Sequence, residues 1–378
     1  PVIAPGGSDS ADFDQALEML FLTGRSLPHV MMMMIPEPWS GHETMGDDKR
    51  GFYEFHASMM EPWDGPASIA FTDGETCGAV LDRNGLRPSR YYVTKDGMVV
   101  MASEVGVLPI DEANIEYKGR LQPGKMFLVD INEGRIISDE EIKSKISTQK
   151  PYTQWIKDNQ VNLKDLPSAE FQFKSDNETV LSRQIAFGYS AEDLKFVMAP
   201  MVGDATESTG SMGNDTPLAI LSQKPQLLFN YFKQLFAQVT NPAIDSIREE
   251  LVMSMEITLG KERNLLAESP EHCRKLKIEH PILTGHEMEK IRGLNQSDLK
   301  TVVLPILFSA SEGQAGLKEA LDKLCQQASQ AIEEGATILI LSDKGMDVDN
   351  VPIPSLLATA GVHHHLLREQ TRTQIGLV

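Results

Sequence analysis

The 378-residue sequence has few cysteines, no long apolar run and too little positive charge to balance its acidic residues. Its three cysteines, Cys77, Cys273 and Cys325, are widely spaced and form no CxxC pair. They therefore predict neither a disulfide framework nor a zinc site, and they suit a reducing cytosol or plastid stroma. No apolar run approaches the ~20 residues that a membrane span requires. The formal charge of −19 argues against nucleic acid and anionic membranes as partners, because both are bound through basic patches.

The rest of the composition is that of a globular protein. Hydrophobic residues make up 41% of the chain and charged residues 24%, and a length of 378 residues favours two domains. The pattern changes near residue 150, from short strands to helices and then to alternating strands and helices. The sequence starts at Pro1 without an initiator methionine or a signal-peptide pattern, and it stops after a strand-like segment. We therefore expect an internal piece of a longer chain.

Residues 78–106 are the most informative stretch of the first part. The stretch begins as a short apolar strand, and Arg83-Asn84-Gly85 is a turn with residue types that tolerate positive φ. An edge strand with Pro88 at its start follows. Lys95-Asp96-Gly97 predicts a hairpin, and residues 98–103 return as its second strand. We interpret Asn84-Gly85 as a structural turn.

Apolar periodicity predicts the other elements. In the first part, strands are expected over 68–71, 126–130 and 135–137, and helices over 11–24, 51–61 and 139–147, the last with Ser138 as its cap. In the second part, helices are expected over 227–240, 244–256 and 314–334, and strands over 301–308, 336–343 and 375–378. The alternation after residue 300 is a βαβαβ pattern, which predicts that 301–308 and 336–343 are adjacent parallel strands.

Asp9 lies in a glycine-rich turn just before the first expected helix. Ser10 or Asp12 can cap that helix, and Asp9 can itself be a cap or turn residue. A carboxylate held in such a turn can also bind an ammonium group through charge-assisted hydrogen bonds. The residues alone leave both interpretations open.

Several segments resemble glutamate synthase, a family whose first part is a class II glutamine amidotransferase. In the first part the resemblance rests on Asp82-Arg83-Asn84-Gly85-Leu86-Arg87-Pro88 followed by Ser103-Glu104. In the second part it rests on residues 183–190, 203–208, 232–242, 280–283 and 363–368. Because the matches occur in order in both parts, chance similarity is a poor explanation.

The resemblance implies a fold that is both α/β and α+β. It implies the later part of an αββα N-terminal-nucleophile (Ntn) hydrolase sandwich over 1–158, a connector over 159–180, and the glutamate synthase central domain over 181–378. The central domain would have a mostly parallel sheet and would be incomplete at its C-terminus. We expect residues 66–137 to form one layer of the sandwich, covered by helices over 11–24 and 51–61.

The resemblance also implies the chemistry of the intact protein. Glutamate synthase transfers the amide nitrogen of glutamine to 2-oxoglutarate, with reduction, to give two glutamates. It uses FMN, an iron–sulfur cluster and a reductant, which is NAD(P)H via a small subunit or ferredoxin. In this family a Ser-Asp-Ser element holds the α-amino group of glutamine, which assigns that role to Asp9. The implied role of this chain is to supply Asp9 and a scaffold between the two active sites.

The nucleophilic cysteine of the family is an N-terminal residue, and Pro1 cannot take its place. We therefore expect no catalytic residue in this chain, no bound cofactor or metal, and no activity of the chain alone. The three cysteines are expected to be packed and inert. The glycine-rich stretch 203–216 is acidic and lacks the ending of a phosphate-binding loop, so it is a structural loop or a border of the flavin or 2-oxoglutarate region.

Two features invite other interpretations. His363-His364-His365 cannot converge on one ion, because consecutive helical residues point about 100° apart. Met31-Met32-Met33-Met34 is expected to be a buried helix. A non-catalytic α/β interaction or assembly module that retains the family signature stays open as the alternative function. An amidophosphoribosyltransferase would need two adjacent acidic residues at an apolar strand end, and 301–378 has none.

Overall fold

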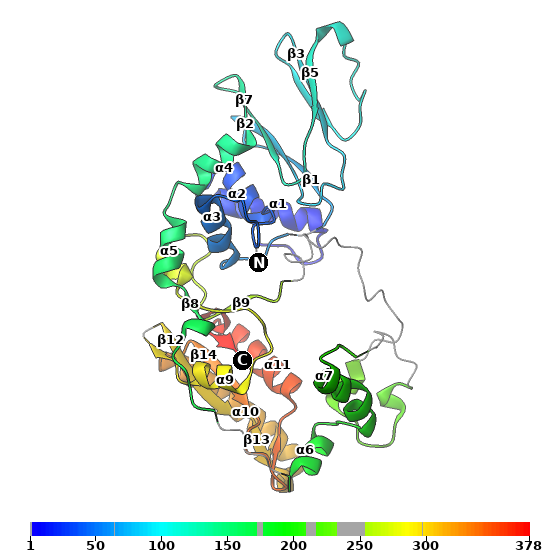
Figure 1. The fold of residues 1–378 in the computed structure, drawn as a ribbon, viewed down its shortest axis with the longest axis vertical. Coiled ribbons are helices and arrows are strands. Elements are labelled where there is room, and N and C mark those ends of the chain that lie inside the picture. The colour runs from blue at the N-terminus through cyan, green and yellow to red at the C-terminus, as the bar shows by residue number, and fades with distance from the viewer. Residues whose placement is uncertain (1, 64, 172–176, 209–216, 233–253, 297) are drawn as a thin grey trace. The chain divides into compact units, whose positions relative to one another are not determined.

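A computed structural model describes residues 2–63, 65–171, 177–208, 217–232, 254–296 and 298–378 (Figure 1). The chain divides into two compact units. The first unit is built from 1–161 together with 244–258 and 262–275, and the second from 162–243, 259–261 and 276–378. The first unit is therefore not continuous in sequence, because a short return segment over 262–275 belongs to it. No helix that the structure describes is long and apolar enough to cross a membrane.

Five helices of the first unit lie within the described residues. They are α1 (Asp9–Phe21), α2 (Leu27–Met34), α3 (Asp47–Ala57), α4 (Asp139–Ser147) and α5 (Tyr152–Asn159). Side-chain oxygens of serines cap three of them: Ser8 accepts from the amide of Ala11, Ser26 from that of His29, and Ser138 from that of Glu141. The cap of α1 is therefore Ser8, and the prediction of Ser10 or Asp12 was wrong by two residues or more. The helix starts earlier because a serine hydroxyl already serves its first turn.

The core of the first unit is formed mainly by α2 and α3. Every residue of α2 is buried, which confirms the interpretation of Met31–Met34 as an apolar core helix. Its methionines pack in one cluster with Phe52, Phe55 and Tyr152. Unbranched methionine side chains suit such a site, because they adapt to the irregular gaps between aromatic rings.

The strands of the first unit form two antiparallel sheets. One has the order β1-β2-β6-β7, with β1 (Ser68–Thr72), β2 (Thr76–Leu81), β6 (Met126–Asp130) and β7 (Arg135–Ile137). The other has the order β4-β3-β5, with β3 (Arg90–Thr94), β4 (Val99–Ala102) and β5 (Ile115–Arg120). All of these strands except β5 fall where the pattern predicted them. The prediction of a single layer over 66–137 was wrong, because the chain leaves the first sheet after β2.

The turn after β2 explains this departure. Asp82 is buried, and its Oδ1 accepts from the amides of Asn84 (2.8 Å) and Gly85 (3.0 Å). Its Oδ2 accepts from the amide of Ala67 at 3.0 Å. One carboxylate thus bends the chain away from β2 and ties the bend to the segment before β1. Asn84-Gly85 is a structural turn, as predicted, and Gly85 has a φ of 63°.

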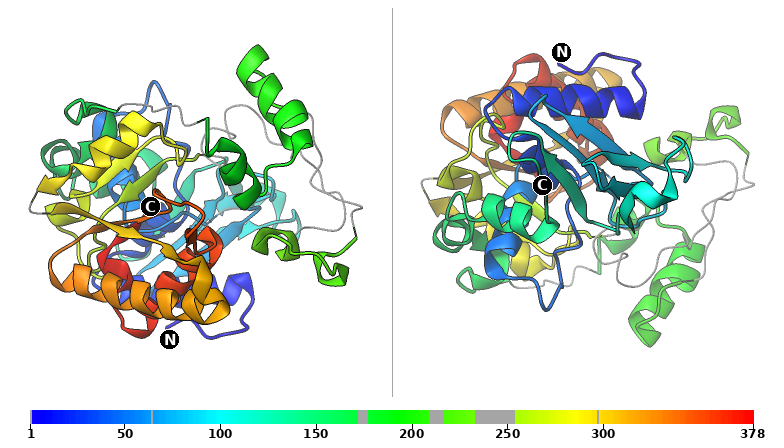
Figure 2. Two further views of the ribbon diagram at one scale, coloured as in Figure 1. Left: turned by 90° about the horizontal axis from the view of Figure 1, so that it is seen from below. Right: turned by 90° about the horizontal axis from the view of Figure 1, so that it is seen from above.

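The second unit contains a sheet in the order β11-β12-β14-β16. Its strands are β11 (Asn295–Gln296), β12 (Leu299–Pro305), β14 (Ile338–Ser342) and β16 (Gly376–Leu377). The pairs β12–β14 and β14–β16 are parallel, as the βαβαβ pattern predicted. Helices α10 (Gly313–Glu333) and α11 (Ser355–Arg368) pack against one another, as Figure 2 shows, and share a core cluster with the sheet.

The predicted strand over 301–308 is two strands. It ends its pairing with β14 at Pro305, and β13 (Leu307–Ser309) then pairs antiparallel with β15 (Asn350–Pro352). Pro305 has no amide hydrogen and cannot continue the ladder as a donor, which explains why a continuous apolar run changes sheets at this point. The error came from treating an apolar run as one strand without regard to its proline.

The remaining described elements are short. They are β8 (Val161–Asn162), β9 (Ile257–Leu259), β10 (Leu276–Ile278), α6 (Val180–Ala186), α7 (Ala199–Asp204), α9 (Gly285–Arg292), a π-helical turn at Asp193–Met198, and 3-10 turns at Glu112–Asn114, Leu163–Asp165, Ala219–Leu221, Leu228–Phe232, Pro270–Cys273, Ala310–Glu312 and Arg372–Gln374. The helices predicted over 227–240 and 244–256 lie largely outside the described residues, as does the end of the 203–216 stretch.

We expect Gly85→Ala to destabilise the first unit more than Gly97→Ala. Both glycines have positive φ, which alone costs an alanine about 1 kcal/mol. A Cβ at position 85 would also overlap the ring of Pro123, whereas a Cβ at position 97 meets nothing within 4 Å. The three tryptophans of the chain, Trp39, Trp63 and Trp155, all lie in the first unit, so their fluorescence during urea unfolding measures its stability. Equal losses in the two variants would contradict the packing described for this turn.

Candidate functional site

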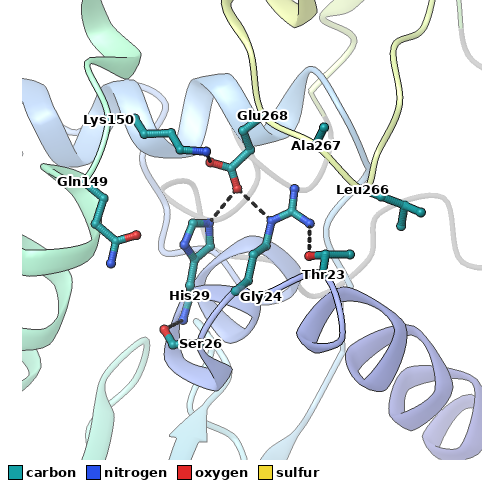
Figure 3. A pocket seen from close by; sticks show the side chains of 10 residues that line it. Thr23, Gly24, Ser26, His29, Gln149, Lys150, Leu266, Ala267 and Glu268 are labelled. Atoms are coloured by element: carbon teal, nitrogen blue, oxygen red, sulfur yellow. Dashed lines mark hydrogen bonds and ion pairs between the residues drawn. The ribbon is translucent and has the colours of Figure 1, made fainter.

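The carboxylate of Glu268 is the centre of a group of polar side chains buried in the first unit (Figure 3). Its side chain is only 3% exposed. Oε1 accepts from Arg25 Nε at 2.7 Å, and Oε2 accepts from Lys150 Nζ at 2.9 Å and from the Tyr152 hydroxyl at 2.8 Å. A carboxylate removed from water requires such partners, because an unpaired buried charge is strongly destabilising.

The partners come from two parts of the first unit that lie far apart in sequence. Arg25 lies in the link between α1 and α2, and its remaining guanidinium nitrogens donate to Thr23 Oγ1 (2.9 Å) and the Leu265 carbonyl (3.0 Å). Lys150 and Tyr152 lie just before and at the start of α5, and Glu268 belongs to the return segment 262–275. These partners therefore fasten that segment to two regions, the link between α1 and α2 and the start of α5.

Two histidines complete the group. His29 lies in the first turn of α2, and His56 is near the end of α3. His29 Nε2 is 3.3 Å from both His56 Nε2 and Glu268 Oε1, and His56 Nε2 is 3.7 Å from the same oxygen. His56 Nδ1 is 2.8 Å from the Phe52 carbonyl. Because a carbonyl oxygen only accepts, Nδ1 of His56 carries a hydrogen.

Burial and charge set the protonation of the group. Burial lowers the pKa of His56 to about 4, even though the nearby Glu268 carboxylate opposes that shift, so this imidazole is neutral at pH 7. Burial by itself raises the pKa of Glu268, but its contacts with His29, His56, Lys150 and Arg25 outweigh burial and hold that pKa well below its usual range. Burial and the nearby carboxylate raise the pKa of Tyr152. The centre is thus an ionised carboxylate beside a neutral His56.

A cavity of about 440 Å³ adjoins the group. It is lined by Thr23, Gly24, Arg25, Ser26, His29, Gln149, Lys150, Leu266, Ala267 and Glu268, whose side chains Figure 3 draws. Most of these residues are polar, so the cavity suits water or a small polar ligand better than an apolar one. Such a site can hold a cation between its imidazoles and carboxylate, or position water beside them.

The sequence did not indicate this group. Arg25 and Glu268 are 243 residues apart and the two histidines are 27 residues apart, so no local spacing brings them together. The one available signal was a lone histidine in the apolar helix α2 and another beside the aromatic residues of α3, where a buried imidazole needs a partner.

Asp9, the residue predicted to bind glutamine, is elsewhere in the first unit. It is the first residue of α1 and is exposed, and the structure does not bring it into the Glu268 group. Because Ser8 caps the helix, Asp9 is not the capping residue. Among the described residues, no donor forms a hydrogen bond with its carboxylate.

The cysteines are not all packed. Cys273 is buried and Cys325 half-buried, as predicted, but Cys77 is exposed on β2, which corrects that part of the expectation. The strand pattern was right, but Cys77 lies near the start of β2, outside the core cluster that buries Ala79 and Leu81 on the same face. The histidines of α11 make ordinary polar contacts, with Arg372 donating to His363 Nδ1 (2.9 Å) and His365 Nε2 lying 2.8 Å from Ser329 Oγ.

We expect Cys77 to react first with a thiol reagent in the folded chain. Burial raises the pKa of Cys273 to about 12 and also raises the pKa of Cys325, so both have little thiolate at pH 8. Peptide mapping after a short pulse of iodoacetamide should find the label on Cys77, and label on Cys273 only after unfolding in urea. Native labelling of Cys273 at the rate of Cys77 would contradict its burial.

We expect Glu268→Ala to destabilise the first unit by about 3 kcal/mol, because it leaves Arg25 and the other donors unpaired in a buried site. Urea unfolding followed by tryptophan fluorescence measures this loss. Glu271→Ala is the matched control in the same segment, since Glu271 is half-exposed and forms only a 3.7 Å ion pair with Arg263. Its effect should stay within about 0.5 kcal/mol. Equal effects of the two changes would show that the Glu268 group does not hold the segment.

Comparison with known proteins finds two family models in the chain. The model described as glutamine amidotransferases class-II matches residues 1–155, and the model described as glutamate synthase central domain matches residues 182–378. The chain is 47% identical over its whole length to the glutamate synthase [NADPH] large chain of Bacillus subtilis, of which it covers 24%. It is 42% identical, over 100% of its length, to the glutamate synthase [NADH] of Schizosaccharomyces pombe, of which it covers 18%. It is also 42% identical, over 99% of its length, to the chloroplastic ferredoxin-dependent glutamate synthase of Spinacia oleracea, of which it covers 23%. The chain thus spans about a fifth to a quarter of the length of these relatives.

Proposed function

Because the chain belongs to the glutamate synthase family, we propose that it takes part in glutamine-dependent synthesis of glutamate within a longer protein. The reaction transfers the amide nitrogen of glutamine to 2-oxoglutarate, with reduction, and gives two glutamates. The observation that supports this proposal is the order of the two domains in one chain, an amidotransferase region followed by the central domain. This chain supplies a residue that binds glutamine and the scaffold between the glutamine site and the second active site.

The residue that binds glutamine is Asp9. Its carboxylate is exposed in the first turn of α1, and Ser8 already fills the capping role. The turn before it passes through Gly6, whose φ of 80° favours glycine and which fixes how the chain enters the helix. A carboxylate so placed accepts charge-assisted hydrogen bonds from the α-ammonium group of glutamine and so positions the side-chain amide for attack.

The flavin and the iron–sulfur cluster that the family implies belong, in this proposal, to other parts of the intact protein. Iron–sulfur clusters are held by several cysteine thiolates. The three cysteines of this chain lie on β2, in the Pro270–Cys273 turn and on α10, and the described residues form no group of them. The residues present do not fit the cluster. The reductant is NADPH, NADH or ferredoxin, the three donors that the relatives' names contain.

The proposed domains are the amidotransferase part over 1–158, a connector over 159–180 and the central domain over 181–378. We place the intact protein in the cytosol or the plastid stroma. The low cysteine content and the chloroplastic and bacterial relatives support that placement.

We expect Asp9→Asn, made in the intact enzyme, to raise KM for glutamine by roughly ten- to hundredfold, because it removes a charged hydrogen-bond partner of the substrate. Glutamate formation from free ammonia should change little, since ammonia bypasses the glutamine site. Steady-state assays with glutamine and with ammonium chloride measure both activities.

Asp14→Asn is the matched control, because Asp14 is an exposed acid on the same helix. It should leave both activities unchanged. Equal loss of the glutamine-dependent and ammonia-dependent activities in Asp9→Asn would show that Asp9 has a structural role instead.

A further inference from the structure

Three buried atoms of the Glu268 group are spaced like the ligands of a metal ion. Among the described residues, His29, His56 and Glu268 are the group whose ligand atoms lie close enough together to hold an ion. Their separations are 3.3 Å (His29 Nε2 to His56 Nε2), 3.3 Å (His29 Nε2 to Glu268 Oε1) and 3.7 Å (His56 Nε2 to Glu268 Oε1). Ligands of a tetrahedral ion with bonds of about 2.0–2.1 Å lie roughly 3.3–3.4 Å apart. Two of the three separations match one face of such a tetrahedron, and the third, 3.7 Å, needs only a small closing movement.

The hydrogen bonds around these three atoms leave too few hydrogens for each close pair of them to form a hydrogen bond. His56 Nδ1 donates to the Phe52 carbonyl at 2.8 Å, so Nε2 of the neutral ring presents a lone pair. On Glu268, Arg25 uses one lone pair of Oε1, and Lys150 and Tyr152 use Oε2. The other lone pair of Oε1 faces the histidines. Two acceptors therefore share at most one hydrogen, that of His29 Nε2, at 3.3 Å from each.

We propose that His29 Nε2, His56 Nε2 and Glu268 Oε1 bind one divalent transition-metal ion, with Zn²⁺ as the best fit. Two imidazoles and a carboxylate are a ligand set that zinc accepts, with a fourth position left for water. The adjoining cavity, which His29 and Glu268 line, supplies that water. The bond from His56 Nδ1 to a backbone carbonyl is the outer support that zinc-binding histidines usually have. His29 binds in the tautomer that carries its hydrogen on Nδ1.

Lys150 is the internal competitor of the ion. Its ammonium lies 2.9 Å from Glu268 Oε2, and its charge opposes a second cation at the same carboxylate. Its side chain is 40% exposed, so it can turn into solvent when the ion binds. Arg25 is 6% exposed and stays on Oε1. The site is thus weaker than an isolated set of these ligands, and its affinity depends on Lys150.

The bound ion would join α2, α3 and the return segment through one centre. Each of its three protein ligands comes from a different one of these elements. The effect is a stabilisation of the first unit that rises with ion concentration. This inference does not depend on the role proposed for Asp9, so the two can fail separately.

The test is titration of the EDTA-treated 378-residue chain with ZnCl₂ by isothermal calorimetry. The wild-type chain should bind one equivalent. His29→Gln and His56→Gln should weaken binding by at least about tenfold, since each removes a ligand. Lys150→Met should tighten it severalfold. Co²⁺ in place of Zn²⁺ should give the visible absorption of a four-coordinate site in the wild type, and tryptophan fluorescence verifies that each variant is folded.

His364→Asn is the control, because His364 is an exposed histidine of α11 outside the group. It should bind zinc as the wild type does. The proposal is overturned if the wild-type chain binds no zinc, if folded His29→Gln and His56→Gln bind it with unchanged affinity, or if His364→Asn abolishes binding. It is also overturned if Lys150→Met weakens binding.

Discussion

The first unit depends on one buried carboxylate, that of Glu268. Ionised and almost fully enclosed, it would be strongly destabilising without partners, and it is tolerated because Arg25, Lys150 and Tyr152 donate to it. Together with His29 and His56, these contacts hold a segment from late in the sequence against α2, α3 and the start of α5. Apolar packing around Met31–Met34 supplies the bulk of the core, but it is non-directional. The charged group determines which segment packs there and in which register.

A second carboxylate, that of Asp82, has a similar role elsewhere in the first unit. Asp82 bends the chain after β2 and ties the bend to Ala67, so the strands divide into two sheets. Both carboxylates act through hydrogen bonds to several segments at once. Asp82 accepts hydrogen bonds from backbone amides close in sequence, whereas Glu268 accepts them from side chains more than a hundred residues away.

Local sequence patterns predicted those strands whose formation depends on residues that are close together in the chain. Alternation and turn residues located β1, β2, β3, β4, β6 and β7, and continuous apolar runs located the parallel pair β12 and β14. The same patterns failed where a single residue changed the path of the chain, as at Pro305, or where Asp82 divided one expected layer into two sheets. The Glu268 group was beyond their reach, because only the folded chain brings Arg25, His29 and His56 to it. Asp9 was indicated by resemblance to a family motif, since nothing in its local pattern distinguishes a ligand-binding acid from any other acid near a helix start.

Because the return segment 262–275 packs within the first unit, the border of the amidotransferase region depends on the energy of that packing as well as on sequence similarity. A chain cut after residue 161 would retain the guanidinium of Arg25, the imidazoles of His29 and His56 and the ammonium of Lys150, but would lose the one anion that they surround. The positive charges of Arg25 and Lys150 would then lie in the same region without the carboxylate that neutralises them. A gene fragment that ends where the similarity to the amidotransferase model ends would therefore lack this charge compensation and would yield an electrostatically frustrated protein.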